Sequence, residues 1–132
     1  MITKVSHVGV VVNNLDKMLQ MYESIFQLKP SAVKDGMGGK LRIAFLPVGD
    51  GEIELLQPMD PKTSFGKFLQ SHGEGLHHIA LTSDNIDSEI ARLKKEGVAF
   101  DGDPRVGAHG VRIVFTMPET TGGMAYEILE QH

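Results

Sequence analysis

Apolar and polar positions alternate between a strand-like and a helix-like pattern at the start of the chain. The stretch 5–12 is apolar and β-branched, which is typical of a buried strand. Asn13 or Asn14 is then placed to cap a helix that has ended by Pro30. The apolar residues that recur at helical spacing behind this cap are Leu15, Met18, Leu19, Tyr22 and Ile25 or Phe26.

Further strands and helices follow from the same kind of pattern. A glycine-rich break at 36–39 and a Gly-Asp-Gly turn at 49–51 separate apolar runs that predict two paired strands. A short helix with Phe65, Phe68 and Leu69 as its buried face is expected in the middle of the chain. The two paired strands cover 40–46 and 52–57, and the short helix covers about 64–72. The remaining expected elements are strands at 76–82, 98–100, 111–116 and 124–129 and a helix at 86–95.

Four short blocks recur in the same order in the two halves of the chain. Their offsets are 71, 71, 70 and 73 residues, so the order and the spacing are both kept. Such a repeat indicates that one structural unit has been duplicated. The matching blocks are 7–10 with 78–81, 14–16 with 85–87, 42–45 with 112–115, and 53–56 with 126–129.

The duplicated pattern predicts an α+β fold in which each half is a βαβββ unit. We expect the two repeats to form one cupped mixed β-sheet with helices outside. We further expect a single domain over 1–132. In this interpretation repeat one covers about 1–58, a linker helix about 59–75 and repeat two about 76–132.

Composition narrows the classes of partner and location. The formal charge is −4 and no block of lysines or arginines occurs, so nucleic acid is not an expected partner. No stretch resembles a signal peptide or reaches the roughly 18 apolar residues that a bilayer span needs. The absence of cysteine excludes disulfides and thiolate ligands. We therefore expect a cytoplasmic protein without a membrane partner.

Four polar residues stand inside strands that are otherwise apolar. His7 and His78 interrupt the first strand of each repeat, and Glu54 and Glu127 stand in the last. A lone histidine in a strand is usually satisfied or half-exposed, and a lone glutamate usually faces solvent. Because a buried unpaired carboxylate is costly and both residue types recur at matched places, we interpret the four as ligands of one divalent cation. This donor set suits Co, Ni, Mn, Zn or Fe, and argues against a closed structural zinc site.

Further sequence blocks carry a resemblance to a known family. They are Gly-Glu-Gly-Leu-His-His-Ile-Ala-Leu at 73–81, Gly-Ala-His-Gly at 107–110, Thr-Gly-Gly at 121–123, and the run from 44–49 into 52–58. With these blocks the whole chain resembles methylmalonyl-CoA epimerases of the vicinal-oxygen-chelate (glyoxalase/bleomycin resistance/dioxygenase) superfamily. The twofold pattern is common to that superfamily, whereas the first two blocks are more specific to the epimerase branch.

The resemblance implies inversion at C2 of methylmalonyl-CoA through an enolate intermediate. It implies that His7, Glu54, His78 and Glu127 bind one divalent metal ion (Co, Mn, Ni or Zn) and that Glu127 is a catalytic acid or base. It also implies an acyl-CoA substrate and a homodimer. Some relatives carry a second glutamate where this chain reads Lys-Leu-Arg-Ile at 40–43, so the second proton carrier has no assignment; Arg42 is not expected to transfer protons.

Two further histidines are expected to lie outside the ligand set. His78 aligns with His7 in the repeat, so its neighbour His77 should point to the opposite face of the strand. His109 stands in a loop flanked by glycines, where an exposed side chain is favoured over one that approaches a substrate.

Three other functions fit the same fold. Glyoxalase I uses a similar two-histidine, two-glutamate set, but the stretch 117–123 lacks the Asp-Pro-Asp-Gly turn common in glyoxalase-like chains. Metal-free binding or resistance proteins generally lack the full ligand set. Extradiol dioxygenases use two histidines and one carboxylate and are usually longer.

Overall fold

The computed structural model describes residues 1–132, which form an α+β fold. None of the helices is both long enough and apolar enough to cross a membrane. The elements, in chain order, are β1 (Ile2–Val11), α1 (Leu15–Met21), a π-helical turn (Tyr22–Phe26), β2 (Ala32–Gly36), a 3-10 turn (Met37–Gly39), β3 (Leu41–Val48), β4 (Gly51–Pro58), α2 (Ser64–His72), β5 (Gly75–Ser83), α3 (Ile86–Lys95), β6 (Arg105–Val106), β7 (Arg112–Phe115), a 3-10 turn (Pro118–Thr120) and β8 (Ala125–Glu130).

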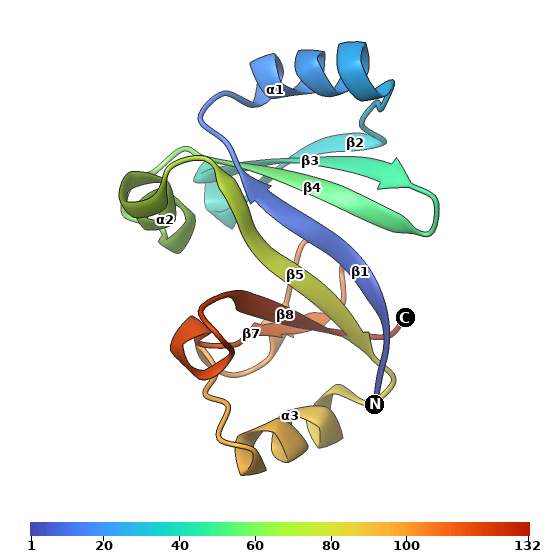
Figure 1. Ribbon diagram of the computed structural model, residues 1–132, viewed down its shortest axis with the longest axis vertical. Coiled ribbons are helices and arrows are strands. Elements are labelled where there is room, and N and C mark those ends of the chain that lie inside the picture. The colour runs from blue at the N-terminus through green and yellow to red at the C-terminus, as the bar shows by residue number, and fades with distance from the viewer. The chain divides into compact units, whose positions relative to one another are not determined.

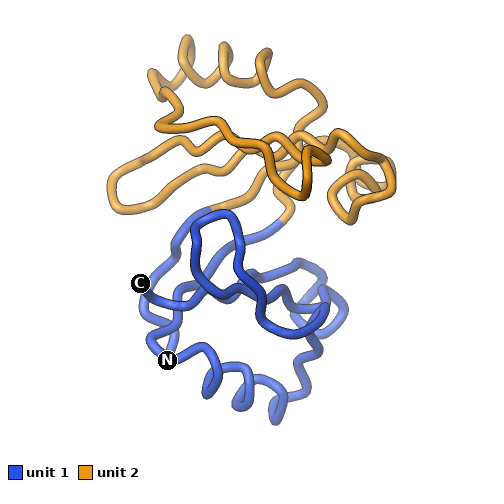
Figure 2. The backbone as a smooth tube through the Cα atoms, turned by 180° about the vertical axis from the view of Figure 1, so that it is seen from behind, with its two compact units in different colours: residues 1–7, 78–132 blue, residues 8–77 orange.

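The chain divides into two compact units, and β1 and β5 each contribute to both. One unit consists of residues 1–7 and 78–132, and the other of residues 8–77 (Figure 2). The hydrogen-bonded strand order is β2-β3-β4-β1 in the unit of residues 8–77 and β5-β8-β7-β6 in the other. The sheet is mixed, because β1 pairs with β4 and β5 pairs with β8 in parallel, whereas the hairpin partners are antiparallel. The βαβββ pattern expected of each half is confirmed.

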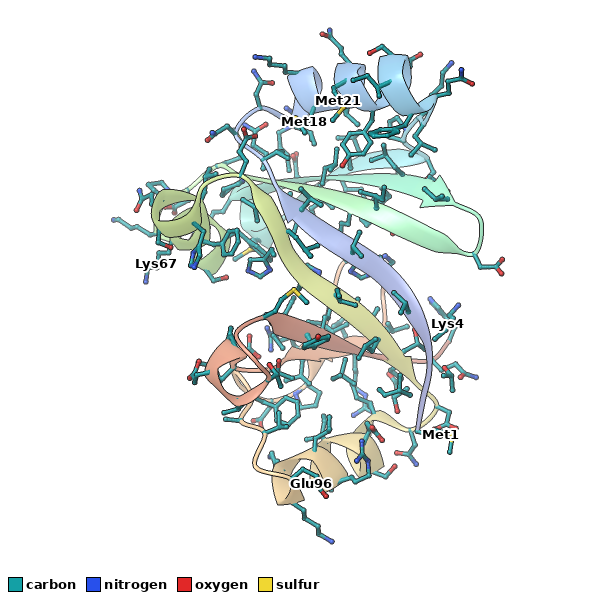
Figure 3. The ribbon with its side chains drawn as sticks, viewed as in Figure 1. Met1, Lys4, Met18, Met21, Lys67 and Glu96 are labelled. Atoms are coloured by element: carbon teal, nitrogen blue, oxygen red, sulfur yellow. The ribbon has the colours of Figure 1, made fainter.

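Each unit packs one helix of the repeat against one face of its own strands. Figure 1 shows α1 beside β2, β3 and β4, and α3 beside β7 and β8. Met18, labelled in Figure 3, lies on the half-buried side of α1, whereas Lys67 on α2 and Glu96 after α3 are exposed. The core under α1 contains Val12, Leu15, Ala44, Leu46 and Leu55, and the core under α3 contains Ile86, Ile90, Val114 and Ile128.

The opposite face of each unit carries the second apolar cluster. In the unit of residues 8–77, α2 closes this face with the half-buried side chains of Phe65, Phe68 and Leu69, as the sequence predicted. That cluster also contains Val11, Leu41, Ile43, Phe45 and Leu56, and its counterpart in the other unit contains Ala80, Val111, Ile113 and Leu129. The proposed ligands stand among residues of these faces.

A polar contact between strand and helix also recurs in both repeats. The Arg42 guanidinium lies 3.4 Å from the Asp16 carboxylate at the start of α1. Its repeat equivalent Arg112 lies 3.1 Å from Asp87 at the start of α3 and 2.9 Å from Glu130 on β8. Hydrogen bonds from Arg112 lower the pKa of both carboxyl groups. The helix N-terminus of each repeat is thus tied to the strand that packs beneath it.

Two segments differ from the expected pattern. Ile25 and Phe26 are 65% and 58% exposed, because the last turn of the first helix is a π-helical turn that rotates them away from the core reached by Leu19 and Tyr22. The strand expected at 98–100 is also wrong. Phe100 forms only an isolated bridge with Thr116, and its half-buried ring packs on the α3 core, which explains its apolar character. The strand at this edge is β6 instead.

The two helix caps provide a matched test of the duplicated fold. The Asn14 side chain accepts a hydrogen bond of 3.0 Å from the Lys17 amide, and the Asn85 side chain one of 3.1 Å from the Ser88 amide. We expect Asn14→Ala and Asn85→Ala each to lower the free energy of unfolding by about 1 kcal/mol, measured by urea denaturation. Asn13→Ala is the control, and an equal loss in that variant would contradict the assignment of the cap to Asn14.

Candidate metal centre

Two buried histidine side chains face each other where β1 and β5 enter the unit of residues 1–7 and 78–132. His7 and His78 are each 1% exposed, and the centroids of their rings lie 5.4 Å apart in an edge-on arrangement. Their Nε2 atoms are 3.3 Å apart. At most one of these two nitrogens can donate a hydrogen bond to the other.

Glu127 on β8 lies beside the two histidines. Glu127 stands opposite Ala80 in the parallel β5–β8 pair. Because Ala80 is two residues beyond His78 on β5, the side chains of His78 and Glu127 project from the same face of the sheet. The Glu127 Oε1 atom lies 3.0 Å from His7 Nε2 and 3.9 Å from His78 Nε2. The carboxylate is 8% exposed, so the three donor atoms form a buried cluster within one unit.

The spacing of these donor atoms fits a shared divalent ion. Ligand atoms about 2.0 to 2.2 Å from one ion stand roughly 3.0 to 3.5 Å from their neighbours in its shell, and somewhat farther across it. The three separations of 3.0, 3.3 and 3.9 Å match that range. Glu127 Oε1 is buried and accepts no hydrogen bond, although His7 is close. A cation among the three atoms would satisfy all of them.

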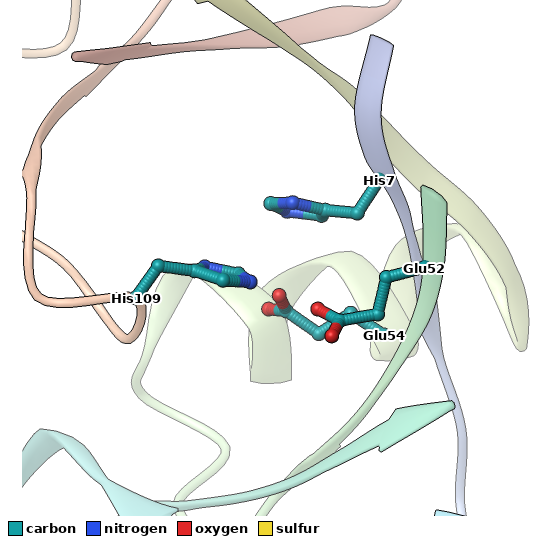
Figure 4. A group of neighbouring side chains, drawn as sticks. All are labelled: His7, Glu52, Glu54 and His109. Atoms are coloured by element: carbon teal, nitrogen blue, oxygen red, sulfur yellow. The ribbon is translucent and has the colours of Figure 1, made fainter. Parts of the chain in front are cut away.

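Glu54 occupies the equivalent register position in the first repeat. It stands opposite Gly9 in the parallel β1–β4 pair, as Glu127 stands opposite Ala80 in β5–β8. The Glu54 side chain is 5% exposed, although a carboxylate on a sheet surface would normally face water. Glu52 is two residues earlier on β4, and both carboxylates project from the same face of this strand (Figure 4).

Beside each glutamate lies a phenylalanine on the neighbouring strand. Phe45 is in register with Glu54, and Phe115 is in register with Glu127. The ring of Phe115 also packs edge-on against the His78 ring, with 5.0 Å between the centroids. These rings give the carboxylates apolar neighbours, which lowers the local dielectric constant and strengthens any interaction with a bound cation.

His109 lies beside this cluster, although an exposed loop position was expected from the sequence. Its ring is half-buried and stacks on that of His7, with 4.7 Å between centroids and 20° between planes (Figure 4). The loop turns back because Gly107 lies against Ile113, where an added Cβ would meet the Ile113 side chain at 2.8 Å. His109 also lines a pocket of about 160 Å³ with Ser6 and Thr82. The flanking glycines were the only available signal, and they indicate a turn without indicating its direction.

His77 and Arg42 point away from the cluster. The His77 ring lies 4.8 Å from the rings of both Phe65 and Phe68 on α2, as expected from strand alternation. Burial, with a smaller contribution from electrostatic repulsion by His72, lowers the pKa of His77 to about 4. Arg42 pairs with Asp16 on the α1 side of its sheet, which separates it from the face of Glu54.

Comparison with known proteins identifies relatives over nearly the whole chain. The sequence profile of the Glyoxalase/Bleomycin resistance protein/Dioxygenase superfamily matches residues 6–115. The mitochondrial methylmalonyl-CoA epimerase of Dictyostelium discoideum is 30% identical over 98% of this chain and 80% of its own length. The ethylmalonyl-CoA/methylmalonyl-CoA epimerase of Cereibacter sphaeroides is 28% identical over 97% of this chain and 98% of its own length.

Solved structures show the same similarity in three dimensions. A variant of the Streptomyces coelicolor methylmalonyl-CoA epimerase in complex with 2-nitronate-propionyl-CoA has a TM-score of 0.90 and 28% identity, covering 99% of both chains. The methylmalonyl-CoA epimerase of Mycobacterium tuberculosis has a TM-score of 0.91 and 28% identity, covering 99% of this chain and 89% of that one.

The lowered pKa of His77 predicts a pH dependence of stability. Between pH 6.5 and about 4 the unfolded chain binds a proton at this residue and the folded chain does not, so stability falls as the pH falls through this window. We expect metal-free wild type to lose up to about 1 kcal/mol per pH unit more than His77→Gln there. Urea unfolding of both proteins at about pH 7 and about pH 5 measures the difference. Equal losses in the two proteins would refute the prediction.

Proposed function

This chain belongs to the Glyoxalase/Bleomycin resistance protein/Dioxygenase superfamily, and on that premise we propose that it is a metal-dependent epimerase that inverts C2 of methylmalonyl-CoA. The observation that carries the proposal is the buried convergence of His7 Nε2, His78 Nε2 and Glu127 Oε1. The activity is inferred from relatives that match nearly the full chain and are methylmalonyl-CoA epimerases.

We propose that His7, Glu54, His78 and Glu127 hold one divalent ion, which is Co, Mn, Ni or Zn. The spacing of the three donor atoms in one unit supports the first part of this set. Glu54 is added because it repeats the register and burial of Glu127 in the other half of the chain. Two imidazoles and two carboxylates bind such an ion and leave coordination positions for an oxygen chelate.

The chemistry required at C2 is the removal of a proton that a carbonyl group makes weakly acidic. A bound divalent ion would supply Lewis-acid stabilisation of the negative charge that develops on the oxygen next to C2. Glu127 is the proposed acid or base that moves this proton, since its carboxylate is buried beside the ion site and borders Phe115. The apolar neighbours limit the access of water to the enolate.

Inversion requires a second proton carrier on the opposite face of C2. Arg42 is excluded from this role, because its guanidinium pairs with Asp16 on the α1 side. The second proton carrier is therefore a group other than Arg42.

We further propose that the protein acts as a cytoplasmic homodimer on an acyl-CoA. The homodimer is inferred from the resemblance to the superfamily, and sedimentation velocity at micromolar concentration measures it. A monomer that retains full epimerase activity would remove this part of the proposal and leave the reaction in place.

Exchange of the C2 proton with solvent tests the reaction. With methylmalonyl-CoA in heavy water, the metal-loaded protein should incorporate deuterium at C2, because an enolate intermediate exchanges that proton; mass spectrometry detects it. Glu127→Gln should retain part of the bound metal and slow turnover by about 10²-fold or more. Arg42→Ala is the control and should cost far less.

Two outcomes would contradict different parts of this proposal. Full turnover in Glu127→Gln would show that another group carries the proton. An absence of exchange together with rapid formation of lactoylglutathione would replace the epimerase by glyoxalase I, with the metal site retained.

Metal content tests the ligand set independently of activity. His78→Ala should remove most of the bound ion, because it deletes a donor atom from the cluster, whereas His77→Ala should bind metal like wild type because its ring faces α2. Inductively coupled plasma mass spectrometry after dialysis gives the stoichiometry. Loss of metal only in the His77 variant would mean that the β5 register is shifted by one residue.

A further inference from the structure

A planar ion pair stands at the β6 edge of the unit that carries the histidine cluster. The Arg105 guanidinium donates hydrogen bonds of 2.8 and 2.7 Å to the two oxygens of the Asp101 carboxylate. Asp101 Oδ1 also accepts a hydrogen bond of 3.2 Å from the backbone amide of Phe115 on β7. A two-point contact of this kind fixes the orientation of the guanidinium as well as its distance. Hydrogen bonds thus connect Arg105 to Asp101 and Asp101 to the Phe115 backbone, and these three residues are called the Arg105 network.

The Arg105 network lies next to two of the proposed metal ligands, His78 and Glu127. The Arg105 guanidinium lies 5.8 Å from the centroid of the Phe115 ring, within the range of a cation–π contact. The same ring contacts the His78 ring, with 5.0 Å between centroids and 88° between planes, and Phe115 is also in register with Glu127. Hydrogen bonding to Asp101, and to a smaller extent the charge of Glu127, raises the pKa of Arg105.

The first repeat contains a looser version of the same arrangement. Lys34 is the repeat equivalent of Arg105, and its ammonium lies 5.6 Å from the centroid of the Phe45 ring. Lys34 is exposed, and an ammonium on a flexible stem makes no planar two-point contact. The rigid arginine version therefore stands in the repeat whose unit holds His7, His78 and Glu127 together.

We propose that Arg105 is a positioning residue that, through Asp101 and Phe115, holds the His78 ring and the Glu127 carboxylate in the orientation needed to bind the ion. The inference rests on the proposed function, since it assumes that these two side chains are metal ligands. An imidazole rotates about its outer torsion with broad, weakly separated minima, so a ring packed against its edge narrows that motion. Contacts just outside a ligand set commonly change metal affinity by about 10-fold to 100-fold.

Three variants on this path and one matched control test the proposal. Arg105→Gln and Asp101→Asn each break the two-point contact, and Arg105→Lys keeps the charge without the planar fork. Arg92→Lys is the control, because Arg92 makes a similar pair with Glu89 on α3, with a shortest contact of 2.7 Å, away from Phe115. Cobalt(II) is the probe ion. Isothermal titration calorimetry gives its dissociation constant, and the visible absorption spectrum reports the geometry of its ligands.

The expected results differ from those of a purely structural ion pair. Arg105→Gln and Asp101→Asn should each weaken cobalt binding by about tenfold and change the visible spectrum, and Arg105→Lys should fall between these variants and wild type. The double variant with both Arg105→Gln and Asp101→Asn should weaken cobalt binding no more than either single variant, because both substitutions break the same pair of hydrogen bonds. In deuterium exchange the loss should appear in kcat more than in KM. Arg92→Lys should retain the wild-type dissociation constant and spectrum.

Two outcomes would overturn the inference at different levels. Wild-type cobalt affinity and spectrum in Arg105→Gln, with only a lowered melting temperature, would reduce the pair to a surface ion pair and leave the proposed function standing. Failure of wild type to bind cobalt would remove the metal site itself, and with it both the proposed function and the role of Arg105.

Discussion

The burial of His7, His78 and Glu127 in one small volume is the interaction on which the site depends. Moving a carboxylate and two imidazoles out of water is unfavourable unless their polar atoms are satisfied by each other or by a cation. The three donor atoms lie 3.0 to 3.9 Å apart, and the glutamate oxygen accepts no hydrogen bond. The cluster is therefore understandable as a binding site for a divalent ion, and it explains why polar residues interrupt strands that otherwise supply the core.

The two repeats place their histidines and glutamates by the same register between parallel strands. In each repeat the glutamate of the last strand stands opposite the residue two places beyond the histidine, in a parallel pair, with a phenylalanine next to it on the neighbouring strand. The helix cap and the arginine–aspartate contact recur as well. A single βαβββ plan thus specifies where a histidine and a carboxylate share a sheet face, and two copies provide the four groups proposed as ligands.

The copies have diverged where they border the proposed ligands. In the second repeat the two-point pair of Arg105 and Asp101 lies beside the phenylalanine, whereas in the first repeat Lys34 lies over Phe45. The second repeat also provides the loop that stacks His109 on His7. Rigid support is thus concentrated in the half that contributes the proposed acid or base, Glu127. Correct orientation of an acid or base speeds proton transfer.

The repeat in the sequence was sufficient to predict the βαβββ plan, the pairing of β3 with β4 and the α2 segment. It also predicted that His77 and His78 point to opposite faces of β5. These features follow from local periodicity, which sets alternation and register. The exposure of Ile25 and Phe26 could not be predicted, since one π-helical turn rotates side chains without changing the apolar pattern. Phe100 resembled a strand residue because a helix core can bury an apolar side chain as well as a sheet can. Only the tertiary structure placed His109 on His7 and Arg105 behind Phe115, because glycine-rich turns and contacts between distant side chains depend on how the backbone closes in space.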